Sequence, residues 1–162
     1  MKTSVVIGIG NPVIADDALG IEVARSVQKQ LIDDQQVAVT EVYNGGLELM
    51  EAMVGFDSAF VIDAIVTGSA PGTIHRLTVD EIGDCRNTST THSGSLTVAL
   101  EFGRLSGVKL PDTILIWAVE AGDISTFREE LTLEVKRAAP VVAAEILHEL
   151  ALNQNEIRRL TP

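Results

Sequence analysis

The stretch that decides the fold is SVVIGIGNPVIADDALG, residues 4–20. Ser4–Gly10 is a nearly continuous apolar run, which is typical of a parallel strand buried on both faces. Two glycines end this run, and two acids, Asp16 and Asp17, stand just before an apolar helical pattern that begins at Ala18. A strand, a glycine turn and a helix in this order predict the first unit of an α/β fold.

Beyond this stretch the chain alternates between apolar runs of strand length and apolar positions at helical spacing. Continuous apolar strands separated by helices predict a mostly parallel, doubly wound sheet of about five strands, covered on both faces in a three-layer α/β/α arrangement. We treat residues 1–162 as a single domain. We expect further strands at Val37–Tyr43, Ala59–Val66, Thr73–Thr78 and Thr113–Ala121, helices at Ala18–Ile32, Leu47–Gly55, Leu96–Gly107 and from Thr132 to about Asn153, and a long polar connection over residues 80–95.

Two local features refine this scheme. Residues 73–78 alternate between apolar and polar side chains, which favours an edge position in the sheet. Pro140 lies inside the last helical pattern, where a proline removes a backbone hydrogen bond. We therefore expect that helix to be kinked or split in two.

The composition excludes several classes of function. The formal net charge is −11 and no basic run exists, so we expect no nucleic-acid partner. The single Cys85 excludes a disulfide framework and a cysteine-built zinc site, which fits a reducing cytoplasm. No stretch approaches the ~20 apolar residues of a membrane span, and the N-terminus lacks the pattern of a signal peptide. We expect a cytoplasmic protein without a membrane partner.

The glycine turn does not match a phosphate-binding loop. Val13 occupies the position where a dinucleotide fingerprint has its third glycine, and the Gly-Lys-Ser/Thr ending of a P-loop is absent. The acidic pair would also repel a pyrophosphate. Asp16 is placed to cap the helix that begins near Ala18. Asp17 falls in the first turn, where a carboxylate is favoured but not required.

Asp63 is a second acid in an unusual place, inside the apolar run AFVIDAIV. A buried carboxylate needs donors, a cation or solvent, and hydrogen bonds from loop amides would satisfy it without any function. If the strands follow a flavodoxin-like order, the first and third are neighbours, and Asp63 converges with Asp17 in the crevice beyond the carboxyl ends.

The histidines differ in what they suggest. His75 and His148 lie in a strand pattern and a helix pattern, and such residues are usually at the surface or in packing contacts. His92 lies in the polar loop STTHSGS, where an ordinary loop histidine is the plain interpretation. Together with Asp17 and Asp63, however, it would form a set of oxygen and nitrogen ligands suited to nickel or zinc.

Four segments resemble the hydrogenase maturation endopeptidases, which process the large subunit of nickel–iron (NiFe) hydrogenases. They are GIGNPVIADDALG (8–20), GFDSAFVIDAIVTG (55–68), TTHSGSLTVALEFGRLSG (90–107) and ILIWAVEAGDISTFREELTLEVKRAAP (114–140), in the family's order. The resemblance implies a flavodoxin-like α/β/α fold. It also implies an endopeptidase that removes a short C-terminal extension from the nickel-loaded large-subunit precursor, its expected partner.

By the same resemblance, Asp17, Asp63 and His92 are the metal-contacting and catalytic residues. The metal would be the nickel held by the precursor, with no tightly bound cofactor, and cadmium or zinc would substitute in crystals. Either the metal polarises the scissile carbonyl or activates water, or a carboxylate acts as general base. We expect a monomer, because a processing enzyme must release its product.

One segment departs from the family pattern. Related proteins often carry Asp-Gly-Gly-Thr-x-Gly after the second strand, whereas this chain has YNGGLELME, with Asn44 in place of the acid. Gly45 and Gly46 still suit a tight turn. Two other functions stay open from the sequence. One is a non-catalytic nickel carrier or assembly chaperone for the same precursor, and the other is a flavin protein on the same scaffold.

Overall fold

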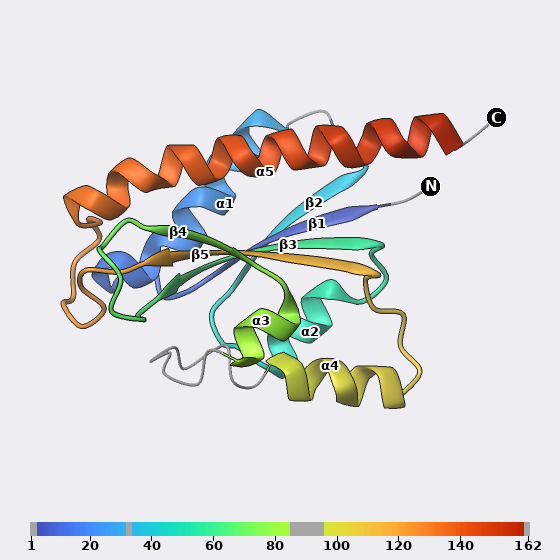
Figure 1. Cartoon of the computed structure of the whole chain (residues 1–162), viewed down its shortest axis with the longest axis horizontal. Helices are drawn as coiled ribbons and strands as arrows, with labels where there is room; N and C mark the ends of the chain where they lie inside the picture. Colours follow the sequence, from blue (N-terminus) through green and yellow to red (C-terminus); the bar gives the residue numbers. More distant parts are fainter. Residues whose placement is uncertain (1–2, 32–33, 85–95, 161–162) are drawn as a thin grey trace.

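A five-stranded, mostly parallel sheet forms the centre of the computed structural model, which describes residues 3–31, 34–84 and 96–160 (Figure 1). The strand order is β2-β1-β3-β5-β4. The parallel strands are β1 (Ser4–Ile9), β2 (Val37–Val42), β3 (Ser58–Ile65) and β5 (Thr113–Glu120), and β4 (Ile74–Leu77) pairs antiparallel with β5. The alternating segment therefore lies at a sheet edge, as its pattern predicts.

Helices cover both faces of this sheet, which confirms the three-layer α/β/α class. One layer contains α1 and α5, and the opposite layer contains α2, α3 and α4 (Figure 1). Their bounds are η1 Ala15–Ala18, α1 Leu19–Gln30, α2 Leu47–Met53, α3 Val79–Asp84, α4 Leu96–Leu105 and α5 Leu133–Leu160, where η1 is a single 3-10 turn.

The hydrophobic core is divided by the sheet into two clusters. Successive side chains of a strand point to opposite faces. In β1, Val6 packs with α1 and α5, whereas Val5 and Ile7 pack against α2 and α4. The buried Trp117 of β5 belongs to the α5 side and its neighbour Ile116 to the α4 side. The central strands β1 and β3, and most of β5, are thus buried on both faces, which explains their nearly continuous apolar sequences.

Two details of the helices differ from the sequence-based expectation. Val79–Asp84 is the helix α3, although a polar connection was predicted from residue 80. Its first turn is a capping box, because the Thr78 N–H donates to Glu81 Oε2 at 2.7 Å while the Glu81 N–H reaches Thr78 Oγ1 at 3.5 Å. These two bonds favour a helix where the composition alone suggested a loop.

The last helix is neither split at Pro140 nor ended at residue 153. It runs as one element, α5, through the proline and on to Leu160 (Figure 1). Pro140 is exposed, while Ala138, Val142 and Ile146 are buried against the sheet. Packing of this apolar face outweighs the hydrogen bond that the proline removes.

The chain reverses its direction of winding at β1. β2 lies on one side of β1 and β3 on the other, and the helices that lead to them cover opposite faces. The carboxyl ends of β1 and β3 therefore border a topological switch point, the usual ligand position in open α/β sheets.

Candidate functional site

The loop after β1 folds back on itself and places Asp17 at the switch point. The Asn11 N–H donates to the Asp17 carbonyl oxygen at 3.2 Å and to Asp17 Oδ2 at 3.0 Å. Gly10 has a φ of +149°, and a Cβ added there would collide with the Asp17 carbonyl oxygen. Glycine is required here because the loop closes directly over its backbone.

A second glycine seats the start of α1 against the strand ends. A Cβ at Gly20 would collide with the carbonyl oxygens of Ile9, which ends β1, and of Ile62, which lies in β3. Only a residue without a side chain allows this approach. The glycines of the opening motif thus allow close backbone contacts that bring the acidic turn near both strands. This role accounts for them without a bound phosphate.

Asp16 does not cap α1, so that expectation is wrong. It is fully buried, and neither η1 nor α1 has a side-chain cap. Its Oδ2 accepts hydrogen bonds from the N–H groups of Gly122 (2.8 Å) and Asp123 (2.9 Å), and its Oδ1 accepts one from the Thr132 N–H (2.7 Å). The Thr132 hydroxyl donates to the same carboxylate. Asp16 therefore fastens the β1–α1 loop to the loop between β5 and α5.

Asp63 lies near the carboxyl end of β3, on the side of the sheet that α2 and α4 cover. It is 6 % exposed, and its Oδ1 has no hydrogen-bond partner. Burial raises the pKa of the Asp63 carboxyl well above its ordinary value, and the charge of Asp17 raises it further, whereas a backbone hydrogen bond from Ala64 acts in the opposite direction. The electrostatic effect of Asp17 indicates that the two carboxylates are near each other.

The third candidate, His92, lies outside the described residues, as does Cys85. Within residues 3–31, 34–84 and 96–160, no group of three or more His, Cys, Asp or Glu side chains is arranged to hold a metal ion. The structure thus brings Asp17 and Asp63 together and leaves the predicted histidine ligand untested.

A further polar cluster at the same edge was missed by the sequence analysis. Glu120, the last residue of β5, is 1 % exposed and accepts hydrogen bonds from the Thr67 N–H (2.7 Å), the Thr67 hydroxyl (2.7 Å) and the Gly68 N–H (2.8 Å). His75 Nε2 lies 3.7 Å from Glu120 Oε2. An acid at the end of an apolar run, as at Asp63, is the signal that could have identified it.

The turn that departs from the family pattern is held internally. Asn44 Nδ2 donates to Glu48 Oε2 at 2.8 Å, and the Tyr43 and Asn44 N–H groups donate to the same carboxylate. Gly46 has a φ of +62°, so the tight turn expected at the glycines is present. Asn44 therefore stabilises the start of α2.

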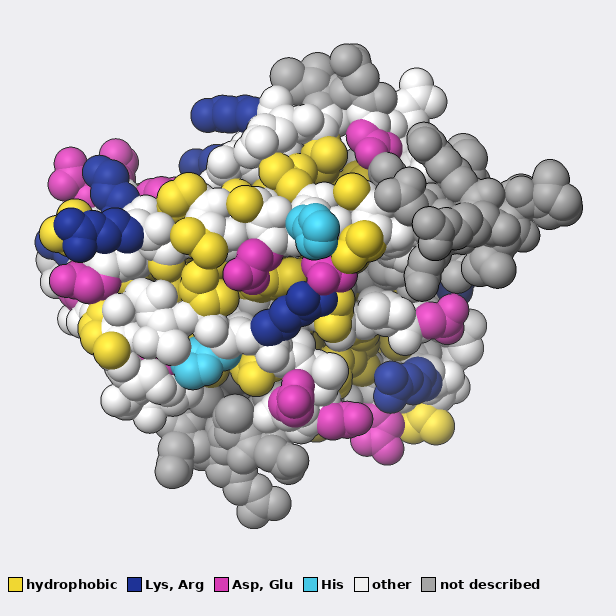
Figure 2. All heavy atoms as spheres, turned by 45° about the horizontal axis from the view of Figure 1, so that its top comes forward, with side chains coloured by type: hydrophobic (Ala, Val, Ile, Leu, Met, Phe, Trp, Pro, Cys, Tyr) yellow, Lys and Arg dark blue, Asp and Glu magenta, His cyan; other side chains and the backbone are white. Residues whose placement is uncertain are grey.

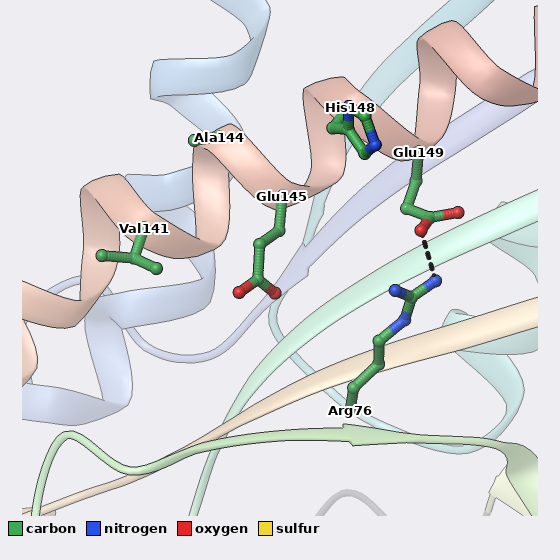
Figure 3. Close-up of a pocket in the computed structure, with 6 residues that line it drawn as sticks. All are labelled: Arg76, Val141, Ala144, Glu145, His148 and Glu149. Atoms are coloured by element: carbon green, nitrogen blue, oxygen red, sulfur yellow. Dashed lines mark ion pairs between the residues drawn. The ribbon is translucent and has the colours of Figure 1, made fainter.

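A hollow on the opposite side of the sheet is a separate feature. It lies between β4 and α5 and is lined by Arg76, Val141, Ala144, Glu145, His148 and Glu149 (Figure 3). Its charged groups are paired, since Arg76 bonds Glu149 at 2.7 Å and Glu145 accepts from the Trp117 ring N–H at 2.8 Å. Figure 2 shows acidic, basic and apolar side chains interspersed on the surface around α5. Neither Asp17 nor Asp63 is among the six residues that line this hollow.

None of the helices in the described part of the chain has the length and apolar character needed to cross a membrane.

Comparisons with known proteins agree on one family. The model of the hydrogenase maturation proteases matches residues 21–149. The hydrogenase 2 maturation protease of Escherichia coli is 31% identical over 78 residues, which are 48% of this chain and 48% of that protein. The hydrogenase expression/formation protein HupD of Thiocapsa roseopersicina is 24% identical over 140 residues, 85% of this chain and 63% of HupD. The matches thus span about half to two thirds of these relatives.

Solved structures show the same fold. The E. coli endopeptidase HybD superposes with a TM-score of 0.82 at 24% identity, over 93% of both chains. The maturation protease HycI of Thermococcus kodakarensis superposes with a TM-score of 0.64 at 25% identity, over 90% of both chains.

Proposed function

Because the chain belongs to the hydrogenase maturation protease family, we propose that it is an endopeptidase that acts on the precursor of a nickel–iron hydrogenase large subunit. It removes a short C-terminal extension once nickel has been inserted. Asp17, Asp63 and His92 contact the nickel that the precursor holds, so that cleavage reports completed metal loading. The enzyme itself holds no tightly bound metal and works as a monomer in the cytoplasm.

The buried carboxylate of Asp63, whose Oδ1 has no hydrogen-bond partner among the described residues, is the observation that supports this proposal most. Its Oδ1 is shut off from solvent without a hydrogen bond, and the charge of Asp17 acts on it unfavourably. A divalent cation between the two carboxylates would relieve both penalties at once, because it replaces lost hydration and offsets the like-charge repulsion. The position, at the switch point of the sheet, is where such folds bind ligands.

Peptide hydrolysis needs a water molecule added to the scissile carbonyl carbon, and a proton delivered to the departing amine. The precursor's nickel would polarise the carbonyl or lower the pKa of a bound water. In this proposal Asp17 or Asp63 would take the proton of the attacking water as general base and then return it to the departing amine. Asp16 has no role in this proposal, since four donor groups of its own chain already bond both of its carboxylate oxygens.

The test is to incubate the protein with nickel-loaded precursor and to follow the precursor's intact mass. We expect the loss of a C-terminal peptide, and a rate at least about 100-fold lower for Asp17→Asn, Asp63→Asn and His92→Ala. Asp112→Asn is the matched control, because Asp112 is an exposed acid in the loop before β5. Precursor binding without any mass loss would contradict the peptidase and identify a nickel carrier or chaperone instead.

The metal contact has its own test in a crystal soaked with a nickel or cadmium salt. An anomalous peak about 2.0–2.5 Å from side-chain atoms of Asp17, Asp63 and His92 together is the expected result. A peak at other residues, or none at saturating metal, would rule out this ligand set.

A further inference from the structure

Two buried side-chain atoms in the described part of the chain have no hydrogen-bond partner, Asp63 Oδ1 and His75 Nε2. Such atoms are rare in native proteins, because each has given up its hydrogen bond to water without a replacement. The proposed nickel contact accounts for Asp63. His75 has no part in that mechanism, and the sequence predicts only a surface or packing residue there.

The register of the sheet places both side chains in one row on one face. Asp63 pairs with Ala118 of β5, and Ala118 pairs with His75 of β4. Directly paired residues point to the same side of a sheet, so a single methyl group stands between the two side chains. Two strand spacings of ~4.8 Å put their Cα atoms roughly 10 Å apart. The next residue, Arg76, points the other way and lies over the Trp117 ring on the α5 side.

Glu120 determines which ring nitrogen of His75 is available. Its Oε2 lies 3.7 Å from Nε2, and a carboxylate beside a ring nitrogen favours a proton on that nitrogen. Nδ1 is then the nitrogen that carries a free lone pair. The side chain of His75 is 29% exposed although Nε2 itself is buried, so another part of this side chain meets solvent.

Glu120 also connects His75 to the strand that carries Asp63. Burial raises the pKa of the Glu120 carboxyl, but hydrogen bonds from Thr67 and Gly68 outweigh burial, and the net pKa is lowered. The carboxylate therefore keeps its charge while it is fixed to the loop that follows β3. This loop begins a few residues after Asp63, so the imidazole and the candidate site lie at the same edge of the sheet.

From this arrangement we infer that His75 is a further substrate-contacting residue, which accepts a hydrogen bond at Nδ1 from a main-chain N–H of the precursor peptide. The inference rests on the proposed function. An extended chain advances about 3.3 Å per residue, so the contact falls roughly three residues from the part of the precursor held at Asp63. Substrate and transition state make such a remote contact equally, and its loss therefore raises KM and leaves kcat unchanged.

The experiment compares three substitutions of His75 in the cleavage assay. Asparagine retains an acceptor oxygen near the place of Nδ1, glutamine retains a polar atom near Nε2, and alanine retains neither. We expect His75→Ala and His75→Gln to raise KM about fivefold to tenfold, the range for one hydrogen bond, with kcat within about twofold of wild type. His75→Asn should stay close to wild type. His148→Ala is the control, because His148 is an exposed histidine of α5.

Two further readouts separate this contact from a purely structural role. Nickel or cadmium binding should be the same in all His75 variants, and thermal melts identify any loss of folding. If His75→Ala does not fold, the inference is tested by the KM of His75→Gln, which should exceed the KM of His75→Asn about fivefold to tenfold. KM values for every variant within about twofold of His148→Ala would overturn the inference. If wild-type protein binds the precursor without cleaving it, the proposed function fails, and the same change in Kd still tests the contact.

Discussion

Replacing Asp16 with alanine should lower the free energy of unfolding by about 3–5 kcal/mol. The substitution leaves three partly buried N–H groups, those of Gly122, Asp123 and Thr132, without the buried carboxylate that accepts their hydrogen bonds. Each such group costs about 1–3 kcal/mol, and water that enters the site recovers part of this. The expected loss is a large fraction of the 5–15 kcal/mol that stabilises a typical domain. The Tm of Asp16→Ala should therefore lie well below that of the wild type.

Asparagine at the same position should cost less, about 2–3 kcal/mol. It retains one acceptor oxygen and the side-chain volume, but it turns an NH₂ group towards donors that need an acceptor. The Asp112→Asn variant is the control, since a substitution of an exposed acid usually changes stability by less than about 0.5 kcal/mol.

Urea unfolding followed by circular dichroism measures these differences. Hydrogen exchange provides the local readout, because the amides of Gly122, Asp123 and Thr132 should lose protection in Asp16→Ala before the sheet does. A loss of less than about 1 kcal/mol with unchanged exchange at these amides would refute the reasoning. The two loops would then be joined by other contacts, such as the N–H of Ala15 to the carbonyl of Arg128.

Three further predictions concern individual residues. Asp63→Asn should stabilise the protein at pH 7. The pKa of Asp63 is raised in the folded state, so the folded protein holds this proton more tightly than the unfolded chain does. The stability of the wild type therefore falls as the pH rises from the ordinary aspartate pKa towards the raised one. The variant should lose this slope in urea titrations between pH 4 and 8 and gain roughly 1.4 kcal/mol per unit of the upward shift. Gly20→Ala should lower stability by about 3 kcal/mol in the same assay, because its methyl group meets two backbone carbonyls. Gly55→Ala meets no atom and should cost only the strain of its φ of +91°, about 1 kcal/mol. Thr78→Ala should cost about 1 kcal/mol through the lost capping box, with exchange faster in the first turn of α3.

The layered fold could be predicted because its signals are local. Buried parallel strands need apolar residues at every position, and β1, β3 and β5 are therefore visible as continuous runs. The alternating pattern of β4 is also a local signal, because a strand with one exposed face carries polar side chains at every second position. The helix α3 also had a local signal, the Thr-x-x-Glu sequence at Thr78–Glu81, which was overlooked.

The role of Asp16 could not be predicted from its neighbours in the chain. An acid before a helical pattern is most often a cap, and the actual donors lie 106 to 116 residues further along. Pro140 is a similar case, because its local preference against a helix is outweighed by packing of the helix face on a distant part of the sheet. The convergence of Asp17 with Asp63 was accessible only through an assumed strand order, which the pairing of β1 with β3 confirms.

The buried acids of the described chain separate into two kinds. Asp16 and Glu120 are each saturated with hydrogen bonds from backbone N–H and hydroxyl groups, and each fastens one loop to the carboxyl edge of the sheet. Asp63 is buried at the same edge but leaves one oxygen without a partner, beside a second carboxylate. Among the described residues, the same edge of the sheet provides hydrogen-bond donors for Asp16 and Glu120 but none for Oδ1 of Asp63. Under the proposed function, the unpartnered Oδ1 of Asp63 is kept for a ligand from outside the chain. The substitution Asp63→Asn, which should stabilise the protein, should for this reason also inactivate it.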